Sequence, residues 1–508
     1  MGIAHLAERE QNNNAAHGEI GAASRSTTRM YPLLFLCIAA VLARIATGLL
    51  LPNIAHPDET FQYLEQAYRL VAGRGLVPWE YEVGARSWLL AWLIWPAEAI
   101  GHALSHDPAV LRGSVVVFLA LLWSGAVAAA YRIGLESAGP RAALFAGLLV
   151  AIWCELVYMA NHMLADSISA VSLLATIAAG IRGPKASHRE LFLAGLLGGL
   201  TIIIRPQLGP ACALALLWTA GLRPRPRWIA LGAGLLVPVA LLGVTDWISW
   251  GAPFHSLRTY LYVNASGVAN LFGVDPASYY LLREFEIWRL ATPLMLVSAV
   301  AGTRRAPLLA IVALAVLVTF SAVPHKEWRF VFPALPILLA LCGTGTAELI
   351  GWLERRTNER WRAGLPNAAA LLWIVLSLLS GLGGTMRAYW TDESGIIRAF
   401  DRASADPAAC GVAIDPADHW EKTGMVRLRG GLMLYGATPD SIEHYNYIVS
   451  ANDPGDPARL RPFGYRRVAC YHQQVCLYRR AGSCTPGTEL AAHPGPQVAD
   501  LLRKLGTR

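Results

Sequence analysis

Apolar segments recur along most of this chain, and no other feature of the sequence constrains its fold as strongly. The first, from Tyr31 to Leu51, is about 20 residues long, enough for a helix to cross the roughly 30 Å hydrocarbon layer of a membrane. Only 15% of residues are charged and 55% are hydrophobic, whereas about 25% are charged in a typical soluble domain. The sequence therefore predicts an all-α polytopic membrane protein. Its apolar runs lie near residues 31–52, 88–104, 112–132, 142–160, 164–181, 191–204, 208–222, 229–247, 291–303, 307–323, 330–353 and 366–388.

Basic residues indicate how these segments are oriented. The net charge of +8 depends almost wholly on arginine, and clusters of basic residues mark the cytoplasmic ends of spans. The clusters fall on one side only if the run at 88–104, which contains Pro96, Glu98 and His102, lies at the outer interface and does not span. About 11 spans then remain, with the N-terminus inside and the C-terminus outside. The clusters are Arg25 and Arg29, Arg132 and Arg141, Arg182 to Arg189, Arg223 to Arg227, Arg304 and Arg305, and Arg355 to Arg362.

This topology divides the chain into three parts. Residues 1–30 are predicted to be a disordered cytoplasmic N-terminus, residues 31–388 the transmembrane domain, and residues 389–508 a soluble domain outside the membrane. Residues 53–110 and 248–290 form the large outer segments of the transmembrane domain. Because a basic surplus in a membrane protein reports orientation, it predicts contact with membrane lipids and no nucleic-acid partner.

The soluble segment 389–508 carries four cysteines and two strand-like stretches. Residues 410–414 and 468–478, separated by Pro, Gly and Asp turns, predict a small α/β domain. Four cysteines in an exported domain permit three disulfide pairings, with free thiols as the alternative. None has the spacing of a metal finger, and we predict no cofactor, since nothing in the sequence supports a divalent metal. The cysteines are Cys410, Cys470, Cys476 and Cys484.

Two polar segments, His56 to Gln62 and Pro324 to Phe330, stand at the ends of apolar runs and fall on the same outer side by parity. Asp58 and Glu59 follow the first span, and Pro57 keeps a helix from running straight through them. A partly desolvated aspartate can act as a general base toward a hydroxyl. The alternative is that Asp58 only caps the helix that follows.

Cations gather on the same side. Lys326 and Arg329, with His325 beside them, stand in a short outer turn and suit an anionic phosphate. Arg205, in another outer turn, and Arg86, at the start of the interfacial helix, add two further cations. The alternative is that these side chains only extend along the bilayer toward water.

Aromatic and amide side chains on the outer segments suit sugar recognition. Gln62 lies in the first outer segment, and Tyr260, Asn264 and Tyr280 lie in the second. The same residue types also form the aromatic belts of membrane proteins, which is the alternative. Inside the membrane domain Arg44, Asp166 and Asp246 are costly in lipid and are predicted to face the bundle interior, without an assigned role.

The chemistry favours transfer over hydrolysis. Glycoside hydrolysis uses two carboxylates about 5 to 10 Å apart, and no second acidic loop pairs with Asp58. One base and a phosphate clamp instead suit displacement of a lipid phosphate by an acceptor hydroxyl. We predict Asp58 as the base, and His325, Lys326, Arg329, Arg205 and Arg86 as phosphate ligands.

At these residues the chain resembles glycosyltransferase family 22, the polytopic α-mannosyltransferases that use dolichol-phosphate-mannose, and within it the GPI-anchor enzymes. The resemblance extends over about 31–388 and is carried by His56 to Gln62, Trp79 to Ser87, Ile204 to Pro206 and Pro324 to Pro333. It implies a GT-C fold, a polyprenyl-phosphate-linked sugar as donor, inversion at the sugar carbon, and Asp58 with Glu59 at the catalytic centre.

The leading hypothesis is therefore a membrane mannosyltransferase that acts on a lipid or glycan acceptor at the outer face of the membrane. The Arg-rich, Lys-poor composition indicates a bacterium, which would place the site and the C-terminal domain in the periplasm. Three alternatives remain open: transfer of another lipid-linked sugar such as an aminosugar, a flippase for lipid-linked sugars, and an inactive scaffold whose tail binds a partner. The absence of an internal repeat disfavours the flippase.

Overall fold

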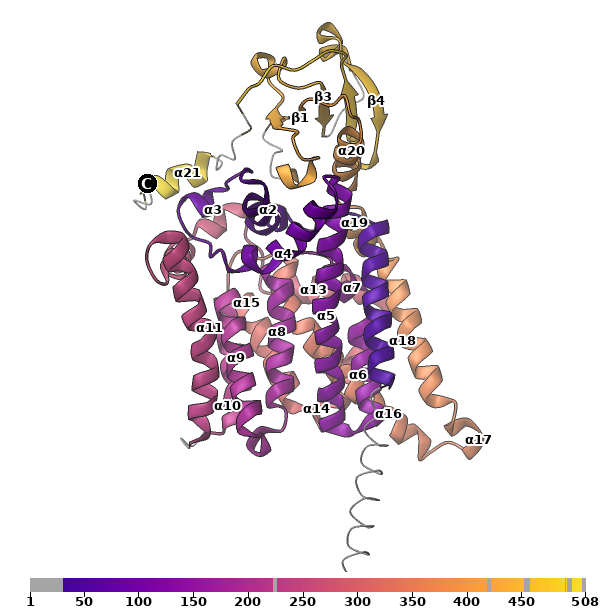
Figure 1. Cartoon of the computed structure of the whole chain (residues 1–508). Helices are drawn as coiled ribbons and strands as arrows, with labels where there is room; N and C mark the ends of the chain where they lie inside the picture. The colour runs from indigo at the N-terminus through magenta and orange to yellow at the C-terminus, as the bar shows by residue number, and fades with distance from the viewer. Residues whose placement is uncertain are drawn as a thin grey trace, which may run out of the picture.

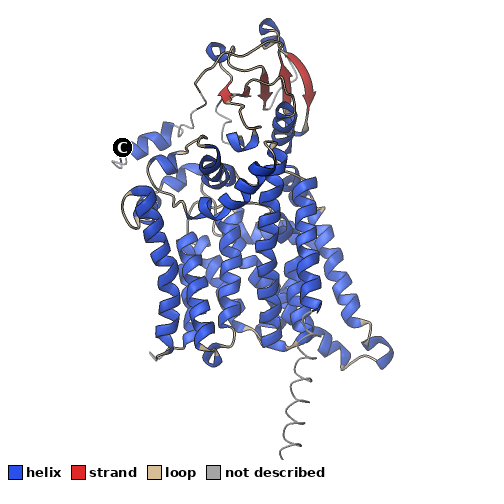
Figure 2. Ribbon diagram, viewed as in Figure 1, coloured by secondary structure: helices blue, strands red, loops and turns tan. Residues whose placement is uncertain are grey.

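A helical bundle carries a small sheet domain on one of its ends (Figure 1 and Figure 2). The structure, a computed structural model, describes residues 31–222, 226–417, 422–451, 457–488, 490 and 496–504. The predicted disordered segment 1–30 and the cluster residues Arg25, Arg29, Arg223 and Arg225 lie outside the described residues. The predicted all-α membrane domain with a C-terminal α/β domain is confirmed, whereas the number of spans stays a prediction.

Six helices in the described part of the chain are long and apolar enough to cross a membrane, and the chain is a multi-pass integral membrane protein. These are Tyr31–Leu50, Pro108–Ala138, Arg227–Trp250, Tyr279–Thr303, Trp328–Glu354 and Glu359–Gly381. Four shorter apolar helices are Leu89–Leu104, Pro140–Ile152, Ala165–Gly180 and Pro307–Ser321.

The elements of the membrane domain follow one another as short segments and long helices. In chain order they are η1 (Glu59–Leu64), α2 (Glu65–Ala72), α3 (Trp79–Glu82), α4 (Leu89–Leu104), α5 (Pro108–Ala138), α6 (Pro140–Ile152), α7 (Cys154–Met159), α8 (Ala165–Gly180), η2 (Gly183–Lys185), α9 (His188–Ile204), η3 (Pro206–Leu208), α10 (Gly209–Ala220), α11 (Arg227–Trp250), α12 (His255–Ala265), η4 (Val268–Phe272), α13 (Tyr279–Trp288), η5 (Arg289–Ala291), α14 (Thr292–Thr303), α15 (Pro307–Ser321), η6 (Trp328–Ala334), α16 (Leu335–Glu354), α17 (Glu359–Arg362), α18 (Leu365–Gly381) and α19 (Gly384–Thr391).

The long helix α5 shows how local sequence sets these boundaries. Its N-cap Asp107 accepts a hydrogen bond from the backbone of Ala109 at 2.8 Å, and Pro108 occupies the first helical position. Gly139, with φ 86°, ends α5 in a conformation that glycine adopts without strain, and α6 begins at the next residue. The two helices pack so closely that a Cβ on Gly134 would lie 2.4 Å from the Ala142 carbonyl oxygen.

Two of the charged residues buried inside the bundle have hydrogen-bond partners there, which offset their cost in lipid. Arg44 of the first helix is fully buried and donates to the backbone oxygens of Ala151 and Val150 at 3.0 Å each. Asp246 accepts from the Ser256 hydroxyl at 2.6 Å. The prediction that Arg44, Asp166 and Asp246 face the interior is confirmed, because all three are 0% exposed.

The C-terminal domain is a five-stranded mixed sheet in the order β2-β1-β3-β5-β4. Strands β2, β1 and β3 run parallel, and β5 pairs antiparallel with both β3 and β4. The elements are α20 (Ser394–Ser404), β1 (Val412–Asp415), η8 (Met425–Arg427), β2 (Leu434–Gly436), η9 (Pro439–Ser441), β3 (Tyr447–Ser450), η10 (Pro457–Arg459), η11 (Arg461–Phe463), β4 (Arg466–Cys470), η12 (His472–Gln474), β5 (Cys476–Arg479) and α21 (Pro496–Lys504).

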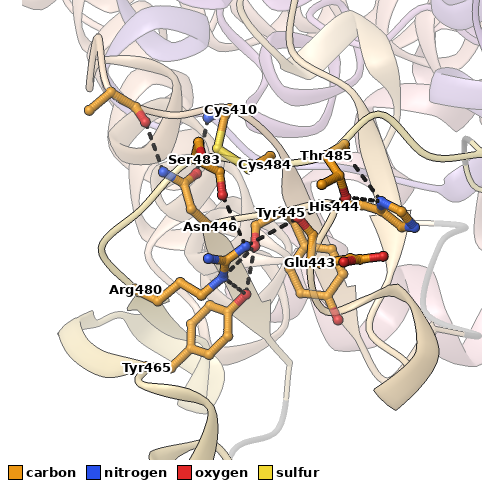
Figure 3. The surroundings of a disulfide bond; sticks show 11 residues. Cys410, Glu443, His444, Tyr445, Asn446, Tyr465, Arg480, Ser483, Cys484 and Thr485 are labelled. Carbon is orange, nitrogen blue, oxygen red and sulfur yellow. Dashed lines mark hydrogen bonds between the residues drawn. A yellow bond between two sulfur atoms is a disulfide. The ribbon is translucent and has the colours of Figure 1, made fainter.

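Two disulfides, Cys410–Cys484 and Cys470–Cys476, cross-link this domain. The first lies beside Asn446, whose side-chain oxygen accepts from the Cys410 backbone at 3.0 Å while its amide donates to Ala408 at 2.8 Å (Figure 3). The predicted disulfides are therefore present, in one of the three pairings that the sequence left open.

The sheet domain is packed onto the first outer segment. One buried core joins Phe61, Tyr68 and Leu76 of that segment to Ile396 and Phe400 of α20. Helix α17 lies at the opposite end of the bundle (Figure 1). The soluble domain, the first outer segment and the ends of the spans that follow it thus gather at one end of the bundle, where the candidate site lies.

Candidate functional site

The two polar segments singled out in the sequence are in direct contact. Asp58 and Arg329, 271 positions apart, form an ion pair in which Arg329 Nη2 donates to Asp58 Oδ2 at 2.7 Å. Asp58 occupies the N-cap position of η1, but its carboxylate makes no capping hydrogen bond. The capping alternative is therefore not the role that the structure gives Asp58. Its carboxylate is held by the cation of the opposite segment.

Glu327 extends this pair into a network. Its carboxylate accepts from Arg329 Nε at 2.6 Å, contacts His56 Nε2 at 3.1 Å and contacts His325 Nε2 at 2.9 Å. His56 also lies 3.5 Å from Asp58 Oδ1 through its other ring nitrogen. The motif that begins at His56 and the motif that begins at Pro324 thus hold each other in place through charge-assisted hydrogen bonds.

Arg205 reaches the same network through a buried acid that the sequence analysis left without a role. Asp166, at the start of α8, lies 2.8 Å from Arg205 Nη2 and 3.8 Å from Arg329 Nη1. Lys326, by contrast, donates its ammonium to the backbone oxygen of Val323 in its own turn. The structure therefore groups Asp58, His325, Arg329 and Arg205, and it holds the Lys326 ammonium on the local backbone.

The charges of this network shift the protonation of its members. Burial by itself would raise the pKa of Asp58, but Arg329 and His56 hold that pKa well below its usual range. Burial and Arg329 lower the pKa of His56, but Asp58 and Glu327 outweigh them and raise it to about 9. The acids Asp58, Glu327 and Asp166 of this network thus each contact at least one of the bases Arg329, Arg205 and His56.

Arg86 is not part of this network of ion pairs. It makes no ion pair within 4 Å in the described part of the chain, its Nε is buried without a hydrogen-bond partner, and its guanidinium lies 5.3 Å from the ring centroid of Tyr260. Both side chains line an open hollow between the first outer segment, α9 and α12, together with Tyr63 and Leu257. We call this the Arg86 hollow. A guanidinium that lines a partly apolar hollow and has no ion pair within 4 Å among the described residues suits an anionic group.

The predicted sugar-binding residues are divided by the fold. Tyr260 lines the Arg86 hollow, and buried Gln62 donates to Glu80 at 2.8 Å. Burial, with the charge of Asp58 as a further cause, raises the pKa of Glu80 to about 7. Asn264 is exposed and donates to the backbone of its own helix at 2.8 Å. Tyr280 is fully buried in α13, and its hydroxyl has no partner among the described residues.

Glu59 turns away from Asp58 toward residues that the sequence analysis did not single out. Its carboxylate accepts from His162 Nδ1 at 2.6 Å and lies 3.9 Å from Arg427 Nη2 of the soluble domain. Arg427 also donates to the Thr60 hydroxyl at 2.9 Å. For His162 the signal was a histidine in an outer turn between two spans, whereas nothing in the sequence connected Arg427 with residues some 370 positions earlier.

The described residues contain no group of three or more His, Cys, Asp or Glu side chains that could hold a metal ion. The carboxylates of the network are instead matched by arginine and histidine.

A membrane helical bundle with an acid and cation network at the end that a soluble domain covers is the arrangement of the GT-C fold. The structure of ArnT from Cupriavidus metallidurans bound to undecaprenyl phosphate aligns with 89% of this chain and 99% of its own length, at a TM-score of 0.60 and 16% identity. At that identity the likeness concerns the fold alone.

The chain belongs to the Alg9-like mannosyltransferase family, whose model matches residues 33–404. The family predicted from the motifs is thereby confirmed. GPI mannosyltransferase 3 of Yarrowia lipolytica is 29% identical over 313 residues, 58% of this chain and 59% of the relative. Human GPI alpha-1,2-mannosyltransferase 3 is 23% identical over 378 residues, 67% of this chain and 65% of the relative. The match thus spans roughly 60% of the length of these relatives.

Proposed function

We propose that the protein transfers a mannosyl residue from a polyprenyl-phosphate-linked donor to a hydroxyl of a lipid or glycan acceptor, with inversion, at the outer face of the membrane. The observation that carries this proposal is the contact between Asp58 and Arg329 beside the Arg86 hollow. The Asp58 carboxylate, its partner Arg329 and the guanidinium of Arg86 lie at one end of an apolar bundle, in a member of a mannosyltransferase family.

The donor phosphate is the group that suits Arg86. As a phosphodiester it carries one negative charge, which the guanidinium of Arg86 can bind in the hollow and Arg329 can bind from the network. Leaving-group charge grows on the phosphate as the bond to the sugar breaks, so these cations stabilise the transition state more than the ground state.

Asp58 takes the acceptor proton in this scheme. The acceptor oxygen forms a bond to C1 of the sugar, the bond between C1 and the phosphate oxygen breaks, and polyprenyl phosphate leaves with the electron pair. The hydroxyl proton passes to Asp58. While Arg329 holds the Asp58 carboxylate, its low pKa makes it a weak base. A donor phosphate that draws Arg329 away raises that pKa, and donor binding thereby prepares the base.

Purified protein supplied with radiolabelled polyprenyl-phosphate-mannose tests this function, with lipid-linked glucose and aminosugar donors in parallel. Octyl α-mannoside and membrane lipid extracts serve as acceptors. We expect transfer from the mannose donor and an α-linked product from a β-linked donor. Movement of the intact donor across a vesicle membrane without any product would contradict the proposal, and so would preference for another sugar.

The side of the membrane needs its own measurement. Asp275, whose backbone donates to Pro324 at 3.1 Å beside the network, and Glu359 of α17 at the other end are both exposed. Single cysteines at these positions, labelled in intact bacterial cells by a reagent that does not cross the inner membrane, should react at 275 and stay unreacted at 359. The reverse pattern would place the site in the cytoplasm and end the periplasmic assignment.

A further inference from the structure

A second hollow lies on the other side of η1, and nothing in the proposed donor chemistry uses it. Its apolar wall includes Leu51 of the first span and Val115 and Val116 of α5, and its polar end includes Glu59, His162 and Arg427. We call it the His162 hollow. It runs from the end of membrane helices to a side chain of the soluble domain, so one end is apolar and the other polar.

His162 is fixed and has one free ring nitrogen. Its side chain packs against Tyr158 with ring centroids 4.7 Å apart, and its residue is 3% exposed. Nδ1 faces the Glu59 carboxylate at 2.6 Å, which leaves Nε2, the other ring nitrogen, for a hydrogen bond to a ligand. Nε2 is buried and has no partner in the described part of the chain. A buried polar atom left unpaired is unfavourable, so a hydroxyl that binds there gains free energy.

The soluble domain supplies the opposite side of this polar end. Arg427 is 8% exposed, and its Nε, like His162 Nε2, is buried without a partner among the described residues. Its position is set from the membrane domain, since the buried carboxylate of Glu65 accepts from the backbone N–H groups of Met425 and Val426 at 3.0 Å each. Gly424, with φ +151°, lets the loop approach, because a Cβ there would lie 2.7 Å from Glu65.

Charge separates the two hollows chemically. In the His162 hollow Arg427 lies near Glu59, and Arg112 forms a two-pronged pair with Asp401 at 2.9 and 3.1 Å. Its two arginines therefore each lie within 4 Å of a carboxylate, whereas Arg86 has no such ion pair among the described residues. Matched charges with free hydrogen-bonding atoms suit neutral hydroxyl groups better than a phosphate.

We propose that the His162 hollow binds the acceptor, and that this acceptor is a sugar carried on a lipid. Its hydroxyls bind His162 and Arg427, and its hydrocarbon lies along the wall of Leu51, Val115 and Val116. The inference rests on the proposed function, which needs an acceptor beside the donor. Helix η1 is common to both sites, since Glu59 lines the His162 hollow, Tyr63 lines the Arg86 hollow, and Asp58 directly precedes the helix.

The test uses octyl α-mannoside with a photoreactive diazirine in its alkyl chain. Crosslinking without donor, followed by peptide mapping, should label residues 48–53 or 111–116, and unlabelled octyl mannoside should compete. His162→Asn keeps a nitrogen for Glu59 in place of Nδ1 and removes Nε2, so labelling should fall about tenfold, the worth of one hydrogen bond of roughly 1.4 kcal/mol. His162→Gln, which keeps a polar group near Nε2, should retain more. His188→Asn, at an exposed histidine, is the matched control.

Arg427→Met should likewise weaken labelling, with the exposed Arg466→Met of β4 as its control. Labelling that maps to the Arg86 hollow, that does not saturate, or that is unchanged in His162→Asn would overturn the assignment. Because crosslinking needs no donor, it tests the acceptor site independently of the transfer assay. Labelled protein that transfers no sugar would refute the proposed function, whereas transfer without labelling of this hollow would refute only the acceptor site.

Discussion

Replacing Asp58 by asparagine should change donor binding and turnover in opposite directions. Asparagine has nearly the same shape and can still accept from Arg329, but it carries no charge and cannot take a proton. In the proposed mechanism the Asp58 carboxylate, 2.7 Å from Arg329 Nη2, competes with the donor phosphate for this guanidinium. Asp58→Asn removes the competitor, so the donor should bind more tightly while transfer slows.

The expected gain in donor affinity can be worked out from the attraction between Asp58 and Arg329. Two unit charges about 4 Å apart attract by about 4 kcal/mol at an effective dielectric constant of about 20. Only part of this attraction energy should appear as tighter donor binding. Glu327 still binds Arg329 Nε at 2.6 Å, and the Asp58 side chain is 23% exposed. We expect a gain of about 1.4–2.8 kcal/mol, a 10- to 100-fold lower donor Kd. Loss of a general base should lower kcat by about 100- to 10,000-fold.

Equilibrium binding of polyprenyl-phosphate-mannose to protein in nanodiscs gives Kd, and initial rates at saturating donor give kcat. Asp406→Asn is the matched control, since Asp406 pairs with Arg479 at 3.1 Å and its side chain is 21% exposed, but it lies in the soluble domain. Wild-type turnover in Asp58→Asn would remove the base assignment. Slower turnover with unchanged or weaker donor binding would instead refute the idea that Arg329 leaves the Asp58 carboxylate to bind the donor phosphate.

Three further outcomes follow from the same contacts. The pKa of His56 is raised to about 9 from an ordinary 6.5, so protonated His56 stabilises the fold fully below pH 6.5, and this stability is lost as pH rises through 9. The loss should be at most about 3 kcal/mol. Thermal unfolding of His56→Gln in detergent should therefore depend less on pH than that of the wild type. Arg86→Gln should raise the donor KM by about 10- to 100-fold, with Arg86→Lys between it and the wild type; an unchanged KM would remove the phosphate assignment. Removing the disulfide Cys410–Cys484, which closes a loop of 74 positions, should destabilise the soluble domain by about 4 kcal/mol. Removing Cys470–Cys476, which closes a loop of 6 positions, should destabilise it by about 2 kcal/mol. Denaturation experiments that gave the opposite order would contradict the loop-closure argument.

The sequence predicted the architecture because hydrophobicity and charge determine it directly. Long apolar runs predict spans, and basic clusters with span parity brought Asp58 and Arg329 to one end before any contact was known. The strand-like stretches near 410 and 468 also became β1, β4 and β5. These inferences need only residue type and order along the chain.

Partners within the site could not be predicted in the same way. Parity places four cations on one face but does not show that Arg205 and Arg329 share Asp166, or that Lys326 is held by its own backbone. Whether a cation is free for a ligand depends on which carboxylate lies within about 4 Å of it, and that depends on packing of helices distant in sequence. The disulfide pairing was open for the same reason.

Asp58 and Glu59 show most clearly what the fold adds. In the sequence they are one acidic pair and were assigned to one centre. Successive residues of a helix point in different directions around its axis, so the start of η1 directs Asp58 to Arg329 and Glu59 to His162 and Arg427. A direct displacement needs its donor and acceptor on opposite sides of the reacting carbon. Helix η1, with Tyr63 at the Arg86 hollow and Glu59 at the His162 hollow, can meet that requirement, and in the proposed mechanism Arg427 of the soluble domain completes the acceptor site.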